Sequence, residues 1–203
     1  MDTSSLRQKL FIEVLLIFLL PVLLLYFNII PIQFRFYVLA ILVCAIIVIV
    51  FREKWGLKDF GIRIPTRRQT MLYIGATILG FFSLLYYATL IGTPLNAQVL
   101  TSKWFLLTFF PVSVLQEVAY RGFLIPMLKK VFDDRMTIIL VNAALFTVLH
   151  IIFKDPNAIL PLSFIAGLFF TTLYMRAPNL ILVSVCHAIL NFFAILFGFF
   201  LIQ

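Results

Sequence analysis

The polar residues buried within the apolar stretches of this sequence are types that carry chemistry. Both histidines of the chain, His150 and His187, lie inside apolar runs, and Glu117 and Arg121 share a third run. Asn191 follows His187 by four residues. A carboxylate, two imidazoles and a carboxamide are suited to activating water and stabilising an oxyanion. The residue types therefore favour a hydrolytic site, provided that the fold brings them together.

Helical spacing arranges these residues in pairs. Glu117 and Arg121 are four residues apart, so they share one helix face and can form an ion pair. Such a pair can also serve structure alone, because each charge lets the other be buried. His187 and Asn191 are likewise one helical turn apart, and an interhelical hydrogen bond would satisfy them without catalysis.

Two further pairs accompany them. Gln116 and Tyr120 form an i, i+4 pair on the strip next to Glu117, and His150 follows Phe146 at the same spacing. Ser184 and Cys186 are weaker nucleophile candidates. Adjacent side chains such as Cys186 and its histidine neighbour diverge around a helix, and Ser184 lacks the context of a nucleophile elbow.

Composition defines the environment of these residues. The chain is 64% hydrophobic and 12% charged, with a mean hydropathy of +1.14. Soluble globular proteins are roughly 45–50% apolar and about 25% charged. Soluble, disordered and nucleic-acid-binding classes are therefore excluded in favour of an all-α polytopic membrane helix bundle. We expect residues 1–203 to form one transmembrane domain whose partners include the lipid bilayer and no nucleic acid.

Seven apolar stretches position the polar residues. A membrane-spanning helix needs about 20 apolar residues. The predicted spans are Leu10–Ile30, Phe36–Phe51, Met71–Ile91, Trp104–Ile125, Met136–Phe153, Ile159–Met175 and Leu180–Ile202. With a rise of about 1.5 Å per residue, the candidate residues fall in the inner to middle part of the membrane. They are expected to line one polar, water-holding cavity.

The basic residues indicate an orientation. Twelve of the 16 Lys and Arg residues fall at the N-terminus or in alternate loops, and three fall on the opposite side. The positive-inside rule then places the N-terminus in the cytoplasm, and the compact chain favours a prokaryotic plasma membrane. The long basic loop Arg52–Thr70 serves this topology or binds anionic lipid head groups or a partner.

The polar residues resemble three motifs of the CAAX-protease and bacteriocin-processing family of intramembrane proteases, also called CPBP or Abi. The first motif has two glutamates, then an aromatic residue and an arginine, and the others place a histidine after an aromatic residue and an asparagine after a histidine. In this chain they fall on Gln116-Glu117, Tyr120-Arg121, Phe146 with His150, and His187 with Asn191.

The resemblance implies a role for each residue. The position of Gln116 would hold the base that activates water, and His150 would hold the same water. His187 and Asn191 would polarise the scissile carbonyl, while Glu117 and Arg121 shape the cavity wall, supported by Tyr120. The substrate would be a peptide or a lipidated protein. A divalent metal ion such as zinc stays open, with candidate ligands Glu117, His150, His187 and Asn191.

One position departs from the family pattern. The family has glutamate where this chain has Gln116, and a carboxamide cannot accept a proton as a base. Gln116 is either an engineered substitution or the mark of a natural pseudoprotease, or else Glu117 acts as the base from the adjacent position. The chain is thus expected to be an impaired intramembrane endopeptidase. The alternatives are an immunity or scaffold protein that binds peptide without cleavage, and a small proton-coupled transporter.

Overall fold

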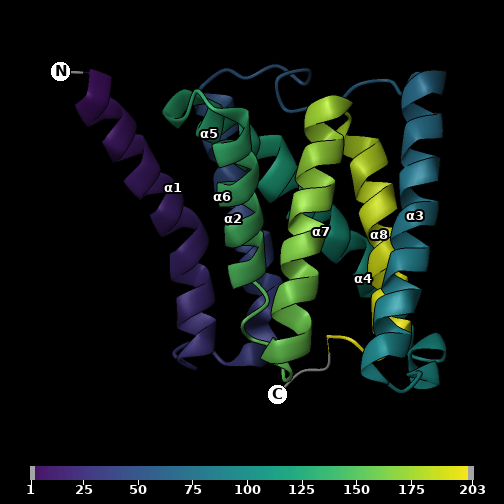
Figure 1. Ribbon diagram of the computed structural model, residues 1–203. Coiled ribbons are helices and arrows are strands. Elements are labelled where there is room, and N and C mark those ends of the chain that lie inside the picture. Colours follow the sequence, from purple (N-terminus) through teal and green to yellow (C-terminus); the bar gives the residue numbers. More distant parts are fainter. Residues whose placement is uncertain (1–2, 201–203) are drawn as a thin grey trace.

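A computed structural model describes residues 3–200 as a bundle of helices that run up and down between two ends (Figure 1). These residues contain no strand, which confirms the all-α bundle. The α-helices are α1 (Thr3–Tyr26), α2 (Arg35–Arg52), α3 (Arg67–Ile91), α4 (Lys103–Glu117), α5 (Ile125–Val131), α6 (Arg135–Val148), α7 (Pro156–Arg176) and α8 (Leu180–Leu196). Two 3₁₀ turns, η1 (Ile32–Phe34) and η2 (Ala97–Leu100), precede α2 and α4, and the π-helical segment η3 (Val118–Leu124) joins α4 to α5.

The described helices correspond to the seven predicted spans, with different ends. By length and composition, four helical stretches are long and apolar enough to cross a membrane: Ser5–Tyr26, Ile32–Arg52, Arg67–Ile91 and Pro156–Arg176. The fourth predicted span is longer than expected, because α4, η3 and α5 follow one another without a break. The fifth and seventh are shorter, since α6 ends at Val148 and α8 at Leu196. The predicted terminus at Ile202 lies outside the described residues.

Local capping explains several helix ends. Thr66 and Gln69 form a capping box at the start of α3, which satisfies two backbone N–H groups that a helix leaves unpaired. Asp134 and Asn179 accept backbone hydrogen bonds at the starts of α6 and α8. Gly92 ends α3 with a φ of 69°, a left-handed conformation that glycine adopts without steric cost.

Polar contacts bring the N-terminus and alternate connections together at one end of the bundle. Arg7 Nη1 contacts Asp133 Oδ2 at 2.7 Å, which joins the start of α1 to the α5–α6 turn. The Leu180 N–H donates to the Gly61 carbonyl at 2.8 Å, which joins the α7–α8 turn to the loop after α2. The connections that carry most of the basic residues therefore share one end, as the alternation of charge predicts.

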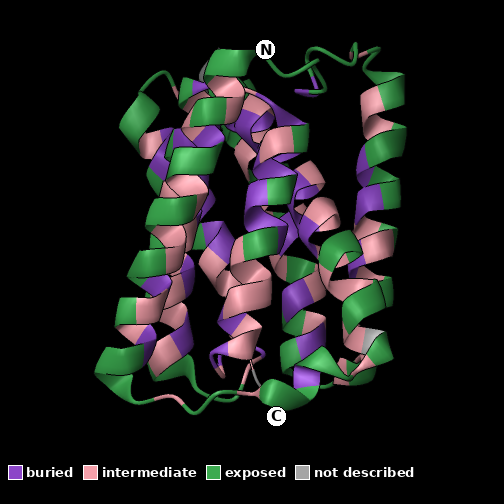
Figure 2. Ribbon diagram, turned by 90° about the vertical axis from the view of Figure 1, so that its right-hand side faces the viewer, coloured by how far each residue is buried: buried purple, intermediate pink, exposed green. Residues whose placement is uncertain are grey.

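Figure 2 shows buried residues toward the inside of the bundle and exposed residues on its outer faces, and many of the exposed residues are large and apolar. Exposed residues include Ile41 on α2, Leu79 on α3 and Ile165 on α7, each more than 60% exposed. Large apolar side chains on an outer surface are expected where the neighbour is lipid rather than water. The interior contains the end of α4 together with η3, where Glu117 and Arg121 are completely buried.

Candidate active site

The first set of candidate residues lies where the central helix changes its winding. Glu117 is the last residue of α4, and Tyr120 and Arg121 fall in η3, where the hydrogen-bonding pattern is π-helical. Short π-helical segments inside α-helices are frequent at functional sites. The Tyr120 hydroxyl donates to the Leu145 carbonyl at 3.2 Å, and Asn142 Nδ2 donates to the Tyr120 carbonyl at 2.8 Å. These bonds anchor η3 to α6.

Glu117 is the centre of a buried polar cluster. Its Oε1 accepts a hydrogen bond from Arg121 Nη1 at 2.9 Å and lies 2.6 Å from His187 Nδ1 on α8. The second carboxylate oxygen, Oε2, has no hydrogen-bond partner among the residues that the structure describes. The predicted ion pair of Glu117 with Arg121 is therefore formed, and it extends to a histidine 70 positions later in the chain.

Arg121 is held from three sides. Its Nη2 donates to the Gly167 carbonyl of α7 at 3.4 Å. Its guanidinium carbon lies 4.7 Å from the ring centroid of Phe146 and 5.4 Å from that of Phe170. Because a cation over an aromatic face is stabilised by the ring quadrupole, these two rings help to keep a charge inside the bundle. Because Arg121 donates a hydrogen bond to Glu117, these contacts also fix the position of the Glu117 side chain.

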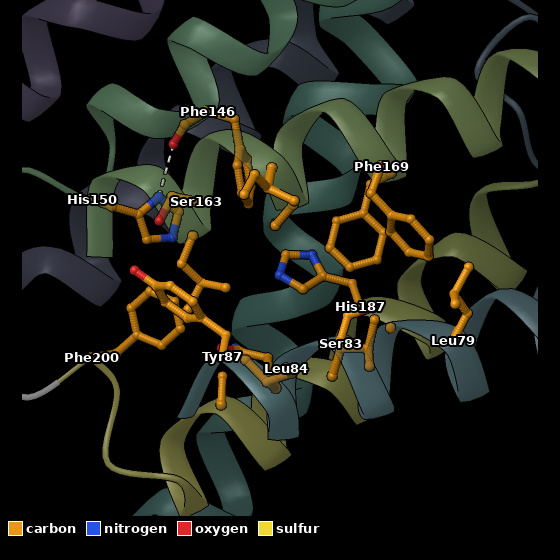
Figure 3. Close-up of a pocket in the computed structure, with 18 of the residues that line it drawn as sticks. Leu79, Ser83, Leu84, Tyr87, Phe146, His150, Ser163, Phe169, His187 and Phe200 are labelled. Carbon is orange, nitrogen blue, oxygen red and sulfur yellow. Dashed lines mark hydrogen bonds between the residues drawn. The ribbon is translucent and has the colours of Figure 1, made fainter. Parts of the chain in front are cut away.

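His187 and His150 face one cavity of about 350 Å³ (Figure 3). The two histidines belong to different segments, and both are about 5% exposed. The other side chains that line the cavity come mainly from α3, α7 and α8 and are mostly apolar. They include Leu79, Tyr87, Leu162, Ser163, Phe170, Leu190 and Asn191. One cavity therefore contains both histidines, but its wall is largely hydrophobic and not polar as expected.

His150 lies beyond the helix that was expected to carry it. The α-helix α6 ends at Val148, and His150 occupies the turn that follows. Its Nδ1 lies 2.8 Å from the Phe146 carbonyl oxygen, so His150 contacts the residue four positions earlier through a backbone atom of that residue. A carbonyl accepts only, which places the proton on Nδ1 and leaves Nε2 as the free acceptor.

Asn191 also lines the cavity and has a partner that sequence reasoning missed. Its Nδ2 donates to Ser113 Oγ at 3.2 Å, and the Ser113 hydroxyl donates to the Phe109 carbonyl at 2.8 Å. Ser113 is completely buried and lies four residues before Glu117, on the same face of α4. That spacing was the available signal, but serine in an apolar helix commonly bonds its own backbone.

Ser163 on α7 is a second polar residue that sequence reasoning missed. It lines the cavity, is 1% exposed, and its hydroxyl has no hydrogen-bond partner among residues 3–200. A buried hydroxyl without a partner is costly by about 1–3 kcal/mol, so its place in the cavity wall offers a hydrogen bond to a bound molecule. No periodicity marked it, because it is a single polar residue within an apolar helix.

Gln116 lies outside the cavity that His150, His187 and Asn191 line. Its side chain lines a second cavity of about 130 Å³ between α1, α2, α4 and the turn after α6. The wall of this second cavity is apolar apart from Gln116, Arg35, Thr108 and Tyr120. The expectation of one cavity lined by all candidate residues is thus wrong, because Gln116 and Tyr120 line the second cavity and Glu117 and Arg121 line neither. Successive helical residues point about 100° apart, and this rotation separates Gln116 from Glu117.

The candidate metal ligands do not form a metal centre. Within residues 3–200, no three His, Cys, Asp or Glu side chains are grouped so that they could hold a metal ion. Glu117 Oε1 is occupied by Arg121 and His187, and Asn191 is bonded to Ser113. The residues present therefore do not fit the zinc site that the resemblance left open.

The serine and cysteine next to His187 do not line the cavity with it. Ser184 and Cys186 are buried on α8, and Cys186 Sγ accepts a hydrogen bond from Thr77 Oγ1 at 3.1 Å. Neither residue is among those that line the cavity. The hydroxyl or thiol therefore has no access to a molecule bound between the two histidines.

Comparison with protein families matches the part of the chain that contains this site. The family described as type II CAAX prenyl endopeptidase Rce1-like matches residues 98–193. This segment runs from η2 into α8 and contains every candidate site residue. In comparisons with curated proteins and with solved structures, nothing matches the chain.

Proposed function

We propose that this protein hydrolyses a peptide bond inside the membrane. The chain belongs, through residues 98–193, to the Rce1-like family of type II CAAX prenyl endopeptidases. One observation carries the proposal: His150 and His187, from different segments, face one cavity of about 350 Å³ within an apolar bundle. Imidazoles buried in a membrane protein are expensive and mark functional sites.

The two histidines are arranged to hold a water molecule. Each has its Nδ1 beside an acceptor, which is the Phe146 carbonyl for His150 and Glu117 for His187. Both Nε2 atoms are therefore left to accept hydrogen bonds from one water. General-base activation of such a water contributes about 10²–10⁴-fold to the rate. Asn191 and Ser163 supply N–H and O–H groups in the same cavity for the oxyanion that forms on the scissile carbonyl.

The cavity also indicates how a substrate enters. Leu79 and Tyr86 on α3 and Ile165 on α7 line it, and each is more than 60% exposed on the outer surface of the bundle. That surface faces lipid in an integral membrane protein, so the opening lies between α3 and α7 within the bilayer. We propose that the substrate is a membrane-associated peptide or lipidated protein that enters sideways, its apolar part against the aromatic wall.

A second candidate function is a pseudoprotease that binds a peptide without cleaving it, as an immunity or scaffold protein would. Gln116 favours this candidate, because the resemblance assigns the water-activating base to that position and a carboxamide cannot act as one. The two candidates share a peptide-binding cavity and differ only in turnover.

The orientation of the site follows from charge. The connections with most of the basic residues share the end of the bundle that holds the N-terminus. The positive-inside rule supports a cytoplasmic position for that end, in a prokaryotic plasma membrane.

Purified protein in liposomes tests the proposed function. The protein should cleave members of a broad panel of quenched fluorescent peptides that carry an apolar or lipidated anchor, and His150→Ala should abolish cleavage. Cys186→Ala is the matched control, because Cys186 is buried next to His187 without lining the cavity. Peptide binding without turnover in the unaltered protein and in Gln116→Glu would establish the pseudoprotease instead.

A further inference from the structure

We infer that His187 is the base that activates the water and that Glu117 is its positioning residue, so that hydrolysis needs no carboxylate at position 116. The inference rests on the proposed function and assigns its proton transfers. It differs from the roles that the family resemblance implies, in which the base is at position 116 and His187 polarises the carbonyl.

The contact between Glu117 and His187 has the geometry of an oriented base. Glu117 Oε1 lies 2.6 Å from His187 Nδ1, and the carboxylate is completely buried. A carboxylate at Nδ1 holds the proton there, leaves Nε2 free as an acceptor, and stabilises the imidazolium that forms when Nε2 takes a proton. Figure 3 shows the His187 ring at the cavity, where Nε2 can meet a bound water.

The surroundings of His187 distinguish it from His150. The charged side chains of the cluster are Glu117 of α4 and Arg121 of η3, and Glu117 Oε1 contacts both Arg121 Nη1 at 2.9 Å and His187 Nδ1 at 2.6 Å. On the cavity side, α3 contributes Tyr86 and Tyr87, His150 lies beyond α6, and the α7 residues that line the cavity carry no charge. His150 has only the neutral Phe146 carbonyl at Nδ1, which stabilises an imidazolium less than a carboxylate does.

The proton balance of the reaction closes with these residues. His187 Nε2 takes a proton from water as the water oxygen bonds to the scissile carbonyl carbon, and Asn191 holds the oxyanion. His187 then gives this proton to the leaving nitrogen as the carbon–nitrogen bond breaks. The products are a carboxylic acid and an amine, Glu117 keeps its charge throughout, and one water is consumed.

The position of Gln116 explains why the chain does not need a glutamate there. Gln116 lines the second cavity with Phe18, Leu42 and Leu149, and His187 does not line that cavity. A carboxylate introduced at this position would face α1 and α2 rather than the water between the histidines. Gln116→Glu should therefore change the cleavage rate by less than about threefold, since a group outside the cavity takes no part in the proton transfer.

The test compares the unaltered protein with Glu117→Gln, Glu117→Asp and Gln116→Glu in liposomes, using a cleavable anchored peptide. Glu117→Gln keeps the shape of the side chain but lowers kcat by about 10²–10⁴-fold with KM nearly unchanged. Glu117→Asp restores part of the rate. A purely structural role of Glu117 would weaken folding and raise KM instead of lowering kcat alone, and Glu117→Asp would then not restore kcat.

Glu117→Gln leaves Arg121 buried without a counter-charge, so a second variant guards against misfolding. The double variant Glu117→Gln/Arg121→Gln removes both charges and keeps a polar pair, and it should bind the peptide yet stay as slow as the single variant. Equal kcat for Glu117→Gln and the unaltered protein overturns the inference. A rate at least tenfold higher in Gln116→Glu overturns it as well and leaves the proposed function standing. Failure of every variant to cleave any peptide overturns both.

Discussion

The bundle contains two cavities, and two neighbouring residues of α4 are related to different ones. Glu117 contacts His187, which lines the larger cavity, whereas the side chain of Gln116 lines the smaller one. Glu117 has two polar partners, while the Gln116 carboxamide makes no hydrogen bond with another residue among 3–200. Two adjacent motif residues can thus differ completely in chemical context, because the helix turns by about 100° between them.

The largest expected effect concerns how much each cavity contributes to catalysis. His187→Ala should lower kcat by about 10²–10⁴-fold, because it removes the imidazole that faces the larger cavity. Gln116→Ala should change kcat less than threefold, since its side chain faces the smaller cavity. Initial rates with one anchored peptide in liposomes measure both. Comparable losses for the two variants would show that the cavities act together in catalysis.

The next effect concerns stability. Arg121→Met should lower the free energy of unfolding by about 3–5 kcal/mol, because it leaves the Glu117 carboxylate buried without its counter-charge. Gln116→Met, a change of similar size on the other side of the helix, should cost less than about 1 kcal/mol. Denaturant titration in detergent measures both. If Arg121→Met unfolds at the same denaturant concentration as the unaltered protein, the ion pair contributes nothing to folding.

A smaller effect concerns the packing of α7, which lines the larger cavity with other residues, against α6. A Cβ atom at Gly167 would lie 2.9 Å from the Ala143 Cα of α6, so Gly167→Ala must push α6 and α7 apart. We expect a loss of about 1–3 kcal/mol, as for an overpacked core. Gly75→Ala on α3 is the control, since a Cβ there meets nothing within 4 Å, and helix propensity favours alanine by about 1 kcal/mol. Thermal unfolding in detergent distinguishes the pair, and equal melting temperatures would contradict the close packing.

Sequence reasoning predicted the fold better than the composition of the site. Apolar runs of about 20 residues and the alternation of basic loops identified every helical pass, because membrane burial imposes length and charge directly on the sequence. The ion pair of Glu117 with Arg121 followed from i, i+4 spacing. The contact of Glu117 with His187 did not, since two helices 70 residues apart must first pack together.

The placement of Gln116 was beyond the sequence for a related reason. Membrane depth gave the height of each residue along its helix, but not the direction in which its side chain points. That direction depends on the rotation of α4 against α1, α2 and α8, and the π-helical segment η3 alters the winding next to the motif. The end of α6 before His150 was equally hidden, because the apolar pattern continues past the last helical residue.

The smallest effect concerns a contact near the start of α1, the helix that contributes to the smaller cavity. Asp133 accepts hydrogen bonds from Arg7, and the guanidinium lowers the pKa of this carboxyl below its ordinary value of 3.8. A carboxyl with a depressed pKa contributes stability above its unfolded pKa and loses it as the pH falls through the folded pKa. Asp133→Asn should therefore be slightly less stable than the unaltered protein at neutral pH, and the gap should close in acid.

Salt provides the control for this contact. The pair is exposed, so high ionic strength screens it and should shrink the same gap at neutral pH. The ion pair of Glu117 and Arg121, which contacts His187 of the larger cavity, is buried. Salt screens a buried pair only weakly, so the cleavage rate should respond little to salt. Melting temperatures and cleavage rates measured across salt concentrations compare the two regions directly. Either of two results would contradict this comparison: a stability gap that persists in high salt, or a cleavage rate that falls as salt rises. In either case the exposed pair and the buried pair would not differ in screening as their burial predicts.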